Sequence, residues 1–304
     1  MADLTVTNAL VPTASRAHKI RLALAFFAIY VVWGTTFLAI RIAVEELPPL
    51  FAAGARFLTA GVLLYGFMRF RGKQRPAAIQ WRNMALMGLL MFVAEYGPLF
   101  WAEKYVPSGI VSVLAATLPI ITMVLEMAIL RQPTRPRVVA ATLLGFAGVA
   151  VLLLGHGGNS FGLLPCVAIL AGAFAWSLGS VLSRGMQLPE SRPLTAGATM
   201  MLGGAGLLAL SAGFGEMHPW PHISLRAAGA LLYLIVCGSL IAFTAFVWLL
   251  AHMPATRVAS HAYVNPIVAV ALGYFVVGEP VTPRTLAGTL LVLVSVFVIL
   301  RKDG

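Results

Sequence analysis

Apolar residues occur along this chain in ten long runs, separated by short connections that often contain proline or glycine. The runs cover residues 20–40, 49–70, 83–103, 108–130, 137–155, 161–183, 194–214, 228–250, 256–277 and 284–301. Each run is close to the ~20 residues with which an α-helix crosses roughly 30 Å of hydrocarbon. The pattern therefore predicts an all-α polytopic membrane protein with ten transmembrane helices.

The pattern of the first half recurs in the second half. At a constant spacing of 147 residues, Trp101, Pro107, Pro119, Pro133 and Pro136 return as Trp248, Pro254, Pro266, Pro280 and Pro283. At a spacing of 143 residues, Trp33, Arg41, Gly54 and Gly61 return as Trp176, Arg184, Gly197 and Gly204. We interpret this as two five-helix repeats, residues 20–155 and 161–301, after an N-terminal tail of residues 1–19. Because five is odd, the second repeat is inverted in the membrane, an arrangement typical of transporters with a substrate site between the repeats.

Composition and charge agree with a membrane protein whose two termini are cytoplasmic. Charged residues make up only 10% of the chain, whereas soluble domains carry roughly 25%. With the N-terminus inside, 16 of the 21 lysines and arginines lie in inner segments, four lie in outer segments, and Arg56 lies within a span. This bias follows the positive-inside rule, so the net charge of +11 needs no nucleic-acid partner to explain it. Cys166 and Cys237 fall within spans and indicate neither a disulfide framework nor a metal site.

Two segments resemble a known family of carriers. WGTTFLAIRIAVEELPPLFAAGARFLTAG, from Trp33 to Gly61, resembles the opening helix pair of EamA-type carriers of the drug/metabolite transporter superfamily. AYVNPIVAVALGYFVVGEPVTPRTLAGTLLVLVSV, from Ala262 to Val296, resembles the end of the second EamA unit, including its Gly-Glu-Pro turn. The resemblance extends over about Ile20 to Arg301. It implies a ten-helix carrier of the bacterial inner membrane, and some members, the YddG-like ones, export amino acids.

Glu95 is the costliest residue in the predicted spans. It lies within the third run, where a carboxylate is unfavourable unless it is paired, hydrated or protonated. Its counterpart in the second repeat is Ala242, so the duplication does not require it. We interpret Glu95 as a site for a substrate ammonium group or a proton; the alternative is an internal salt bridge with Arg56. The related small multidrug exporters use a glutamate in their first helix for proton coupling, but the first run here has no acidic residue.

Other polar and aromatic residues are candidates for the substrate pathway. His261 and Asn265 follow Arg257 at spacings of four in the ninth run and could bind the polar head of a substrate. The alternative for His261 is a structural hydrogen bond to a nearby carbonyl. The aromatic candidates for a cavity lining are Trp33, Tyr96, Trp101, Trp176 and Tyr263. For Trp101 the alternative is an anchor at the membrane interface, and for Trp33 and Trp176 it is packing between the repeats.

Pro119 and Pro266 lie in the middle of the fourth and ninth runs. Each removes a backbone hydrogen bond, so each could act as a hinge or form a fixed kink. The small or polar stripe around Pro119 is typical of close helix packing. At its inner end, Glu126 is expected to pair with Arg131 or to reach the interface.

The predicted function is a secondary transporter that exports small amino acids or related metabolites by alternating access. One alternative is a proton-coupled multidrug or organic-cation exporter with Glu95 as the coupling group; another is a non-transporting receptor or scaffold. Motifs of hydrolases, zinc proteases and phosphate-binding loops are missing from the sequence, so we predict no enzyme activity, cofactor or metal. The expected partners are the lipid bilayer and a small zwitterionic or cationic solute. A monomer suffices for this arrangement.

Overall fold

A computed structural model describes residues 16–130, 136–154, 162–216, 223–252, 258 and 261–300. All regular structure in these ranges is helical. Seven helical stretches are long and apolar enough to cross a membrane, and three shorter apolar helices cover Val139–Val151, Val264–Val277 and Pro283–Val298. The prediction of an all-α protein with several membrane-spanning helices is confirmed.

The helices follow the predicted runs closely. In the first half they are α1 (Arg16–Phe27), η1 (Ala28–Val32), α2 (Trp33–Val44), α3 (Pro49–Phe70), α4 (Ala78–Gly88), η2 (Leu89–Val93), α5 (Ala94–Ala102), α6 (Ser108–Ala115), α7 (Leu118–Leu130) and α8 (Pro136–Leu154). In the second half they are α9 (Leu163–Ser183), α10 (Arg192–Gly213), α11 (Leu225–Tyr233), η3 (Leu234–Ile241), α12 (Ala242–His252), α14 (His261–Leu272), η4 (Gly273–Val277) and α15 (Pro283–Leu300). Proline begins α3, α8 and α15, where its missing N–H costs no helical hydrogen bond.

Four of the helical stretches contain a π-helical segment. At the 147-residue spacing, η2 corresponds to residues 236–240, which lie within η3. A π-helical turn changes the direction of the side chains that follow it and is frequent at functional sites. Here η2 directly precedes Glu95, and η3 carries Ser239. The two segments thus occur at equivalent positions of the two halves.

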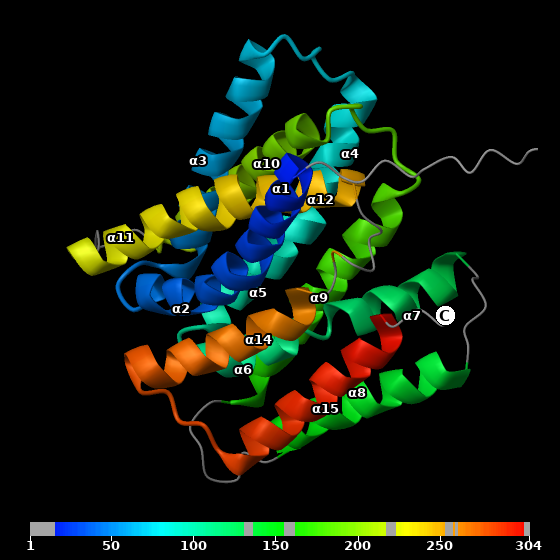
Figure 1. Ribbon diagram of the computed structural model, residues 1–304. Helices are drawn as coiled ribbons and strands as arrows, with labels where there is room; N and C mark the ends of the chain where they lie inside the picture. The colour runs from blue at the N-terminus through cyan, green and yellow to red at the C-terminus, as the bar shows by residue number, and fades with distance from the viewer. Residues whose placement is uncertain are drawn as a thin grey trace, which may run out of the picture.

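The closest contact between the halves joins α3 and α10 (Figure 1). A methyl group added to Gly61 would collide with the backbone nitrogen of Met201, and one added to Gly204 would collide with that of Leu58. Both pairs are related by the spacing of 143, so the contact is symmetric. Glycine permits this approach because it has no side chain to separate the two backbones.

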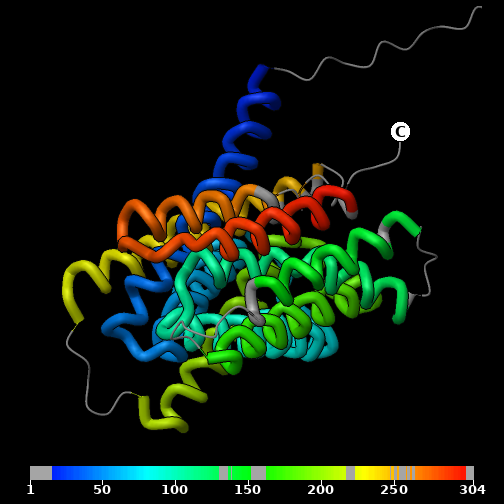
Figure 2. Tube along the Cα trace, turned by 90° about the horizontal axis from the view of Figure 1, so that it is seen from below, coloured from blue at the N-terminus to red at the C-terminus, as the bar shows by residue number. Residues whose placement is uncertain are grey.

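Another pair of equivalent helices is α8 and α15, which pack along each other (Figure 1). In addition, α6 packs on α14, which corresponds mainly to α7 at the spacing of 147. In Figure 2, α1 extends beyond the layer formed by the other helices. Because such helices pack against each other, side chains from both halves contact one another in the interior.

The two mid-span prolines have different local settings. The fourth run is divided between α6 and α7, and Pro119 is the second residue of α7. A proline in a first helical turn leaves no hydrogen bond unmade, so Pro119 begins a helix rather than kinking one. Pro266 lies inside α14. Their roles as hinges remain predictions.

Candidate functional site

A cluster of aromatic rings links helices from both halves. Its members are Trp33 of α2, Phe57 of α3, Phe92 of η2, Tyr96 of α5, Trp176 of α9, Phe243 and Phe246 of α12, and His261 of α14. Phe92 and Phe243, with ring centroids 6.5 Å apart, join its two sides. We call this set the aromatic cluster.

The aromatic cluster is nearly symmetric with respect to the repeat. Tyr96 and Phe243 are equivalent at the spacing of 147, and Trp176 and Trp33 at the spacing of 143. The Tyr96 and Trp176 rings lie 6.0 Å apart, and the Phe243 and Trp33 rings lie 6.5 Å apart. The structure thus brings Trp33, Tyr96 and Trp176 together. Phe243 was missed by the sequence analysis, although its equivalence to Tyr96 could have identified it.

Arg56 of α3 points its charge at this cluster. Its side chain is 3% exposed, and Nε donates a hydrogen bond to Oγ of Ser239 at 3.0 Å. The guanidinium carbon lies 4.7 Å from the ring centre of Phe57 and 5.5 Å from that of Tyr96. Such cation–π contacts stabilise a buried arginine in part. However, Nη1 is buried without a hydrogen-bond partner.

Glu95 lies beside Tyr96 in the chain and is also buried. Its residue is 4% exposed, and Oε2 has no hydrogen-bond partner. The carboxyl group packs on α9, because a methyl group added to Gly172 would lie 2.7 Å from Oε2. The described residues include no ion pair between Glu95 and Arg56, so the internal salt bridge considered from the sequence is not formed. Arg56, which lies near the Tyr96 ring, and Glu95, the preceding residue in the chain, thus each keep a buried polar atom without a partner.

Asn265 supports the π-helical segment of the first helix. In the amide orientation that satisfies both ends, its nitrogen donates to the carbonyl oxygens of Ile29 and Tyr30, each at 3.0 Å. Its oxygen accepts from Nδ1 of His261 at 3.2 Å, and the His261 ring lies 5.0 Å from that of Trp33. Asn265 thus has a structural role, and its bond sets the orientation of His261 against the aromatic cluster. Arg257 and the side chain of Tyr263 lie outside the described part of the structure.

Trp101 lies apart from the aromatic cluster. Its ring neighbours that of Tyr105, 5.3 Å away, at the end of α5. This position agrees with the interface-anchor interpretation.

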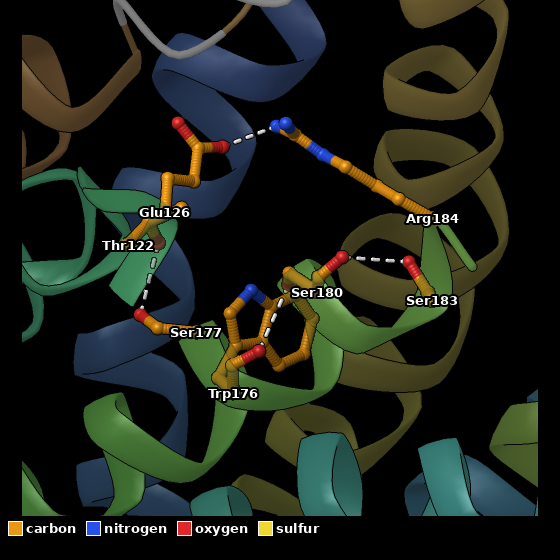
Figure 3. A network of polar contacts seen from close by, with 7 residues as sticks. All are labelled: Thr122, Glu126, Trp176, Ser177, Ser180, Ser183 and Arg184. Atoms are coloured by element: carbon orange, nitrogen blue, oxygen red, sulfur yellow. Dashed lines mark hydrogen bonds and ion pairs between the residues drawn. The ribbon is translucent and has the colours of Figure 1, made fainter. Parts of the chain in front are cut away.

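Glu126 is paired across the two halves. It forms an ion pair with Arg184 at the end of α9, while Thr122 donates to Ser177 of α9 at 3.0 Å (Figure 3). The sequence analysis expected Arg131, which lies outside the described residues, and it missed Arg184 because that residue is distant in sequence. Both side chains of the pair are partly exposed, so the contact contributes little stability.

The family of the chain follows from sequence comparison. The EamA-like transporter family model matches residues 20–154 and 163–301. The chain belongs to the EamA-like transporter family. It is 37% identical over 281 residues to the "Uncharacterized inner membrane transporter YedA" of Escherichia coli K12, a match that covers 91% of this chain and 90% of that protein. It is 26% identical to an "Uncharacterized transporter" of Archaeoglobus fulgidus, over 89% of this chain and 95% of that one.

A solved structure has a similar fold. It superposes with a TM-score of 0.64 at 22% sequence identity and covers 92% of this chain and 96% of its own. As a member of the EamA-like family with several membrane-spanning helices, the protein is a membrane transporter. The resemblance noted from the sequence is confirmed at the level of the family.

Proposed function

We propose that this protein is a secondary transporter that exports small amino acids or related zwitterionic metabolites across the inner membrane by alternating access. In this proposal the chain crosses the membrane ten times with both termini in the cytoplasm. Residues 20–155 and 161–301 form inverted five-helix repeats, as in other transporters with a central substrate site. The symmetric contacts α3/α10 and α8/α15 support this division.

The observation that carries the proposal is the pair of buried ionisable groups beside Tyr96, each of which has a polar atom without a partner. Nη1 of Arg56 and Oε2 of Glu95 are buried without hydrogen-bond partners. An unpaired buried charge is costly, and the cost is offset when a ligand supplies the opposite charge. A zwitterion supplies both: its carboxylate would bind Arg56, and its ammonium group would bind Glu95. The aromatic cluster would then contact the substrate's apolar part, as aromatic side chains do in ligand pockets.

The test compares substrates that lack one of the two charges. Counterflow in proteoliposomes would be measured for an amino acid, its decarboxylated amine and its deaminated hydroxy acid. Arg56→Gln should remove the preference for the amino acid over the amine, because the residue that reads the carboxylate is gone. Glu95→Gln should remove the preference over the hydroxy acid. The matched controls are Arg192→Gln, at the exposed first residue of α10, and Glu190→Gln, at an exposed residue just before that helix.

Unchanged substrate preferences would contradict the proposal. If Arg56→Gln and Glu95→Gln left all three substrate preferences as in the unaltered protein, the two residues would not recognise the charges of a zwitterion.

The second candidate function is a proton-coupled exporter of organic cations, and the unpaired Oε2 of Glu95 also favours it. A buried carboxyl group can exchange a proton for a cationic substrate. In that case a quaternary amine would be transported, Arg56→Gln would leave its transport intact, and Glu95→Gln would abolish proton-driven antiport. Amino-acid flux that is indifferent to the pH gradient would favour the first candidate.

A further inference from the structure

Three glutamates at one end of the bundle cap helices that belong to the opposite half. Glu46, after α2, accepts hydrogen bonds from the backbone nitrogen and Oγ of Ser224 at the start of α11, both at 2.7 Å. Glu216, after α10, accepts from the backbone nitrogens of Leu50 and Phe51 at the start of α3. Glu279, after η4, caps α6. A carboxylate suits such a position because the first N–H groups of a helix have no partner within it.

These contacts all lie at the outer ends of the helices in the proposed topology. Each one ties a segment that ends a helix in one half to a segment that begins a helix in the other half. In a transporter with alternating access, contacts of this kind hold the outer end closed and must break when it opens.

Of the three glutamates, Glu279 accepts the most hydrogen bonds from the opposite half. Oε1 accepts from the backbone nitrogen of Ser108 at 2.8 Å, while Oε2 accepts from Oγ of Ser108 at 3.0 Å and from the backbone nitrogen of Gly109 at 3.2 Å. The side chain folds back over Gly273, where a methyl group would collide with Oε2. Gly278, with φ of 72°, makes the preceding turn in a conformation that favours glycine. The local sequence therefore places this carboxylate on the start of α6.

A second carboxyl group is that of Glu103, five residues before Ser108 in the chain. Glu103 follows the last residue of α5, is fully buried, and has no hydrogen-bond partner at either carboxyl oxygen. The guanidinium of Arg41, from α2, donates to the backbone carbonyl of Glu103. Burial raises the pKa of the Glu103 carboxyl well above its usual range, the charge of Glu279 raises it further, and Arg41 opposes the shift. Lys104, next in the chain, is exposed.

We propose that Glu103 and Glu279 form a proton-binding carboxyl pair that closes the outer end of the transporter. Glu103 holds one proton while Glu279, as a carboxylate, caps α6. When Glu103 releases its proton to the outer medium, the two negative charges repel each other in a poorly hydrated place. Glu279 then leaves the start of α6, and the contact between the halves opens. The outward direction rests on the proposed function; the proton-linked contact itself does not.

The sign of the pH dependence follows from proton linkage. The closed state binds one more proton than the open state, in which Glu103 is hydrated and has an ordinary pKa. Closure is therefore favoured at low external pH and is lost as the pH rises through the raised pKa of the closed state. For one proton, the opening equilibrium changes by at most about tenfold per pH unit.

Hydrogen exchange of the purified full-length protein tests this without any substrate. Protection of the backbone amides at the start of α6, corrected for the intrinsic pH dependence of exchange, would be measured from about pH 5 to about pH 9. We expect protection to fall with rising pH by up to about tenfold per unit. Glu103→Gln, which imitates the protonated group, should remain protected at every pH.

A second variant allows the proposal to be tested even if Glu103→Gln fails to fold. Arg41→Gln removes the charge that lowers the pKa of Glu103, so the fall in protection should begin at higher pH. Level protection in the unaltered protein, a slope that persists in Glu103→Gln, or an unmoved midpoint in Arg41→Gln would overturn the proposal. Because none of these measurements uses flux, their outcome is independent of the zwitterion test.

Discussion

At the outer end of the bundle in the proposed topology, and again beside the aromatic cluster, ionisable side chains lie between helices of the two halves, but their polar atoms are satisfied to different degrees. At the outer end, Glu46, Glu216 and Glu279 each receive two or three hydrogen bonds from the opposite half. Beside the aromatic cluster, Arg56 and Glu95 each keep a polar atom without a partner. A satisfied charge contributes to holding one arrangement of helices, whereas a buried group with an unpaired polar atom costs stability until a ligand supplies a partner. In the proposed mechanism the three caps would hold the outer end closed, and Arg56 and Glu95 would bind the substrate.

The largest expected effect comes from a change that damages both regions at once. Gly61→Ala places a methyl group against the backbone of Met201, where neither helix has a flexible side chain that could yield. Separating α3 from α10 would displace Arg56 and the Glu216 cap together. We expect destabilisation of about 4 kcal/mol or more, or loss of folded protein. Thermal unfolding in detergent and the yield of monodisperse protein would measure it.

Gly66→Ala is the control for this prediction, because nothing lies within 4 Å of a methyl group at that position of α3. It should be neutral or stabilise by up to about 1 kcal/mol through helix propensity. Equal behaviour of the two variants would show that α3 and α10 can separate without cost.

A change confined to the aromatic cluster should lower transport while sparing stability. Glu95→Gln removes a buried carboxyl group whose Oε2 has no partner, so the protein should be as stable as before or more stable by about 1 kcal/mol. Transport of amino acids should fall by roughly a hundredfold, because loss of a buried charge pair with the ligand costs about 2–5 kcal/mol. Flux in proteoliposomes and unfolding temperature would be measured on the same preparation. A marked loss of stability with full transport would mean that Glu95 is structural.

Much of the fold could be predicted from the sequence because it depends on properties of single helices. The run predicted at 49–70 is α3, Pro49–Phe70, since a proline start and an apolar composition are local signals. The glycines matched at the spacing of 143 are the residues at which α3 and α10 touch. Repetition revealed them because a symmetric contact requires small residues on both of its sides.

The chemistry of the site could be predicted only in part. It depends on the directions in which side chains point between helices, and local sequence patterns do not determine these directions. The salt bridge between Arg56 and Glu95, which was the alternative considered from the sequence, is not formed; Arg56 bonds instead to Ser239, which lies in η3. The polar spacing of His261 and Asn265 was visible, yet the partner of Asn265 is a π-helical carbonyl of another helix. Glu103 escaped notice because it lies at the end of a run, where a carboxylate normally reaches water.

A change confined to the outer end should have the smallest effect. In contrast to Glu95→Gln, it should lower stability and leave transport specificity unchanged. Glu216→Ala leaves the first amides of α3 without their acceptor, and loss of such a cap costs about 1–2 kcal/mol. Glu45→Ala is the matched control, because Glu45 forms an exposed ion pair with Arg226 at 3.3 Å that is worth at most about 1 kcal/mol. Glu216→Ala should lower the unfolding temperature more than the control does, while the preference for amino acids over amines stays unchanged. An altered substrate preference would mean that the outer caps and the aromatic cluster act as one site, and the distinction between holding and binding residues would fail.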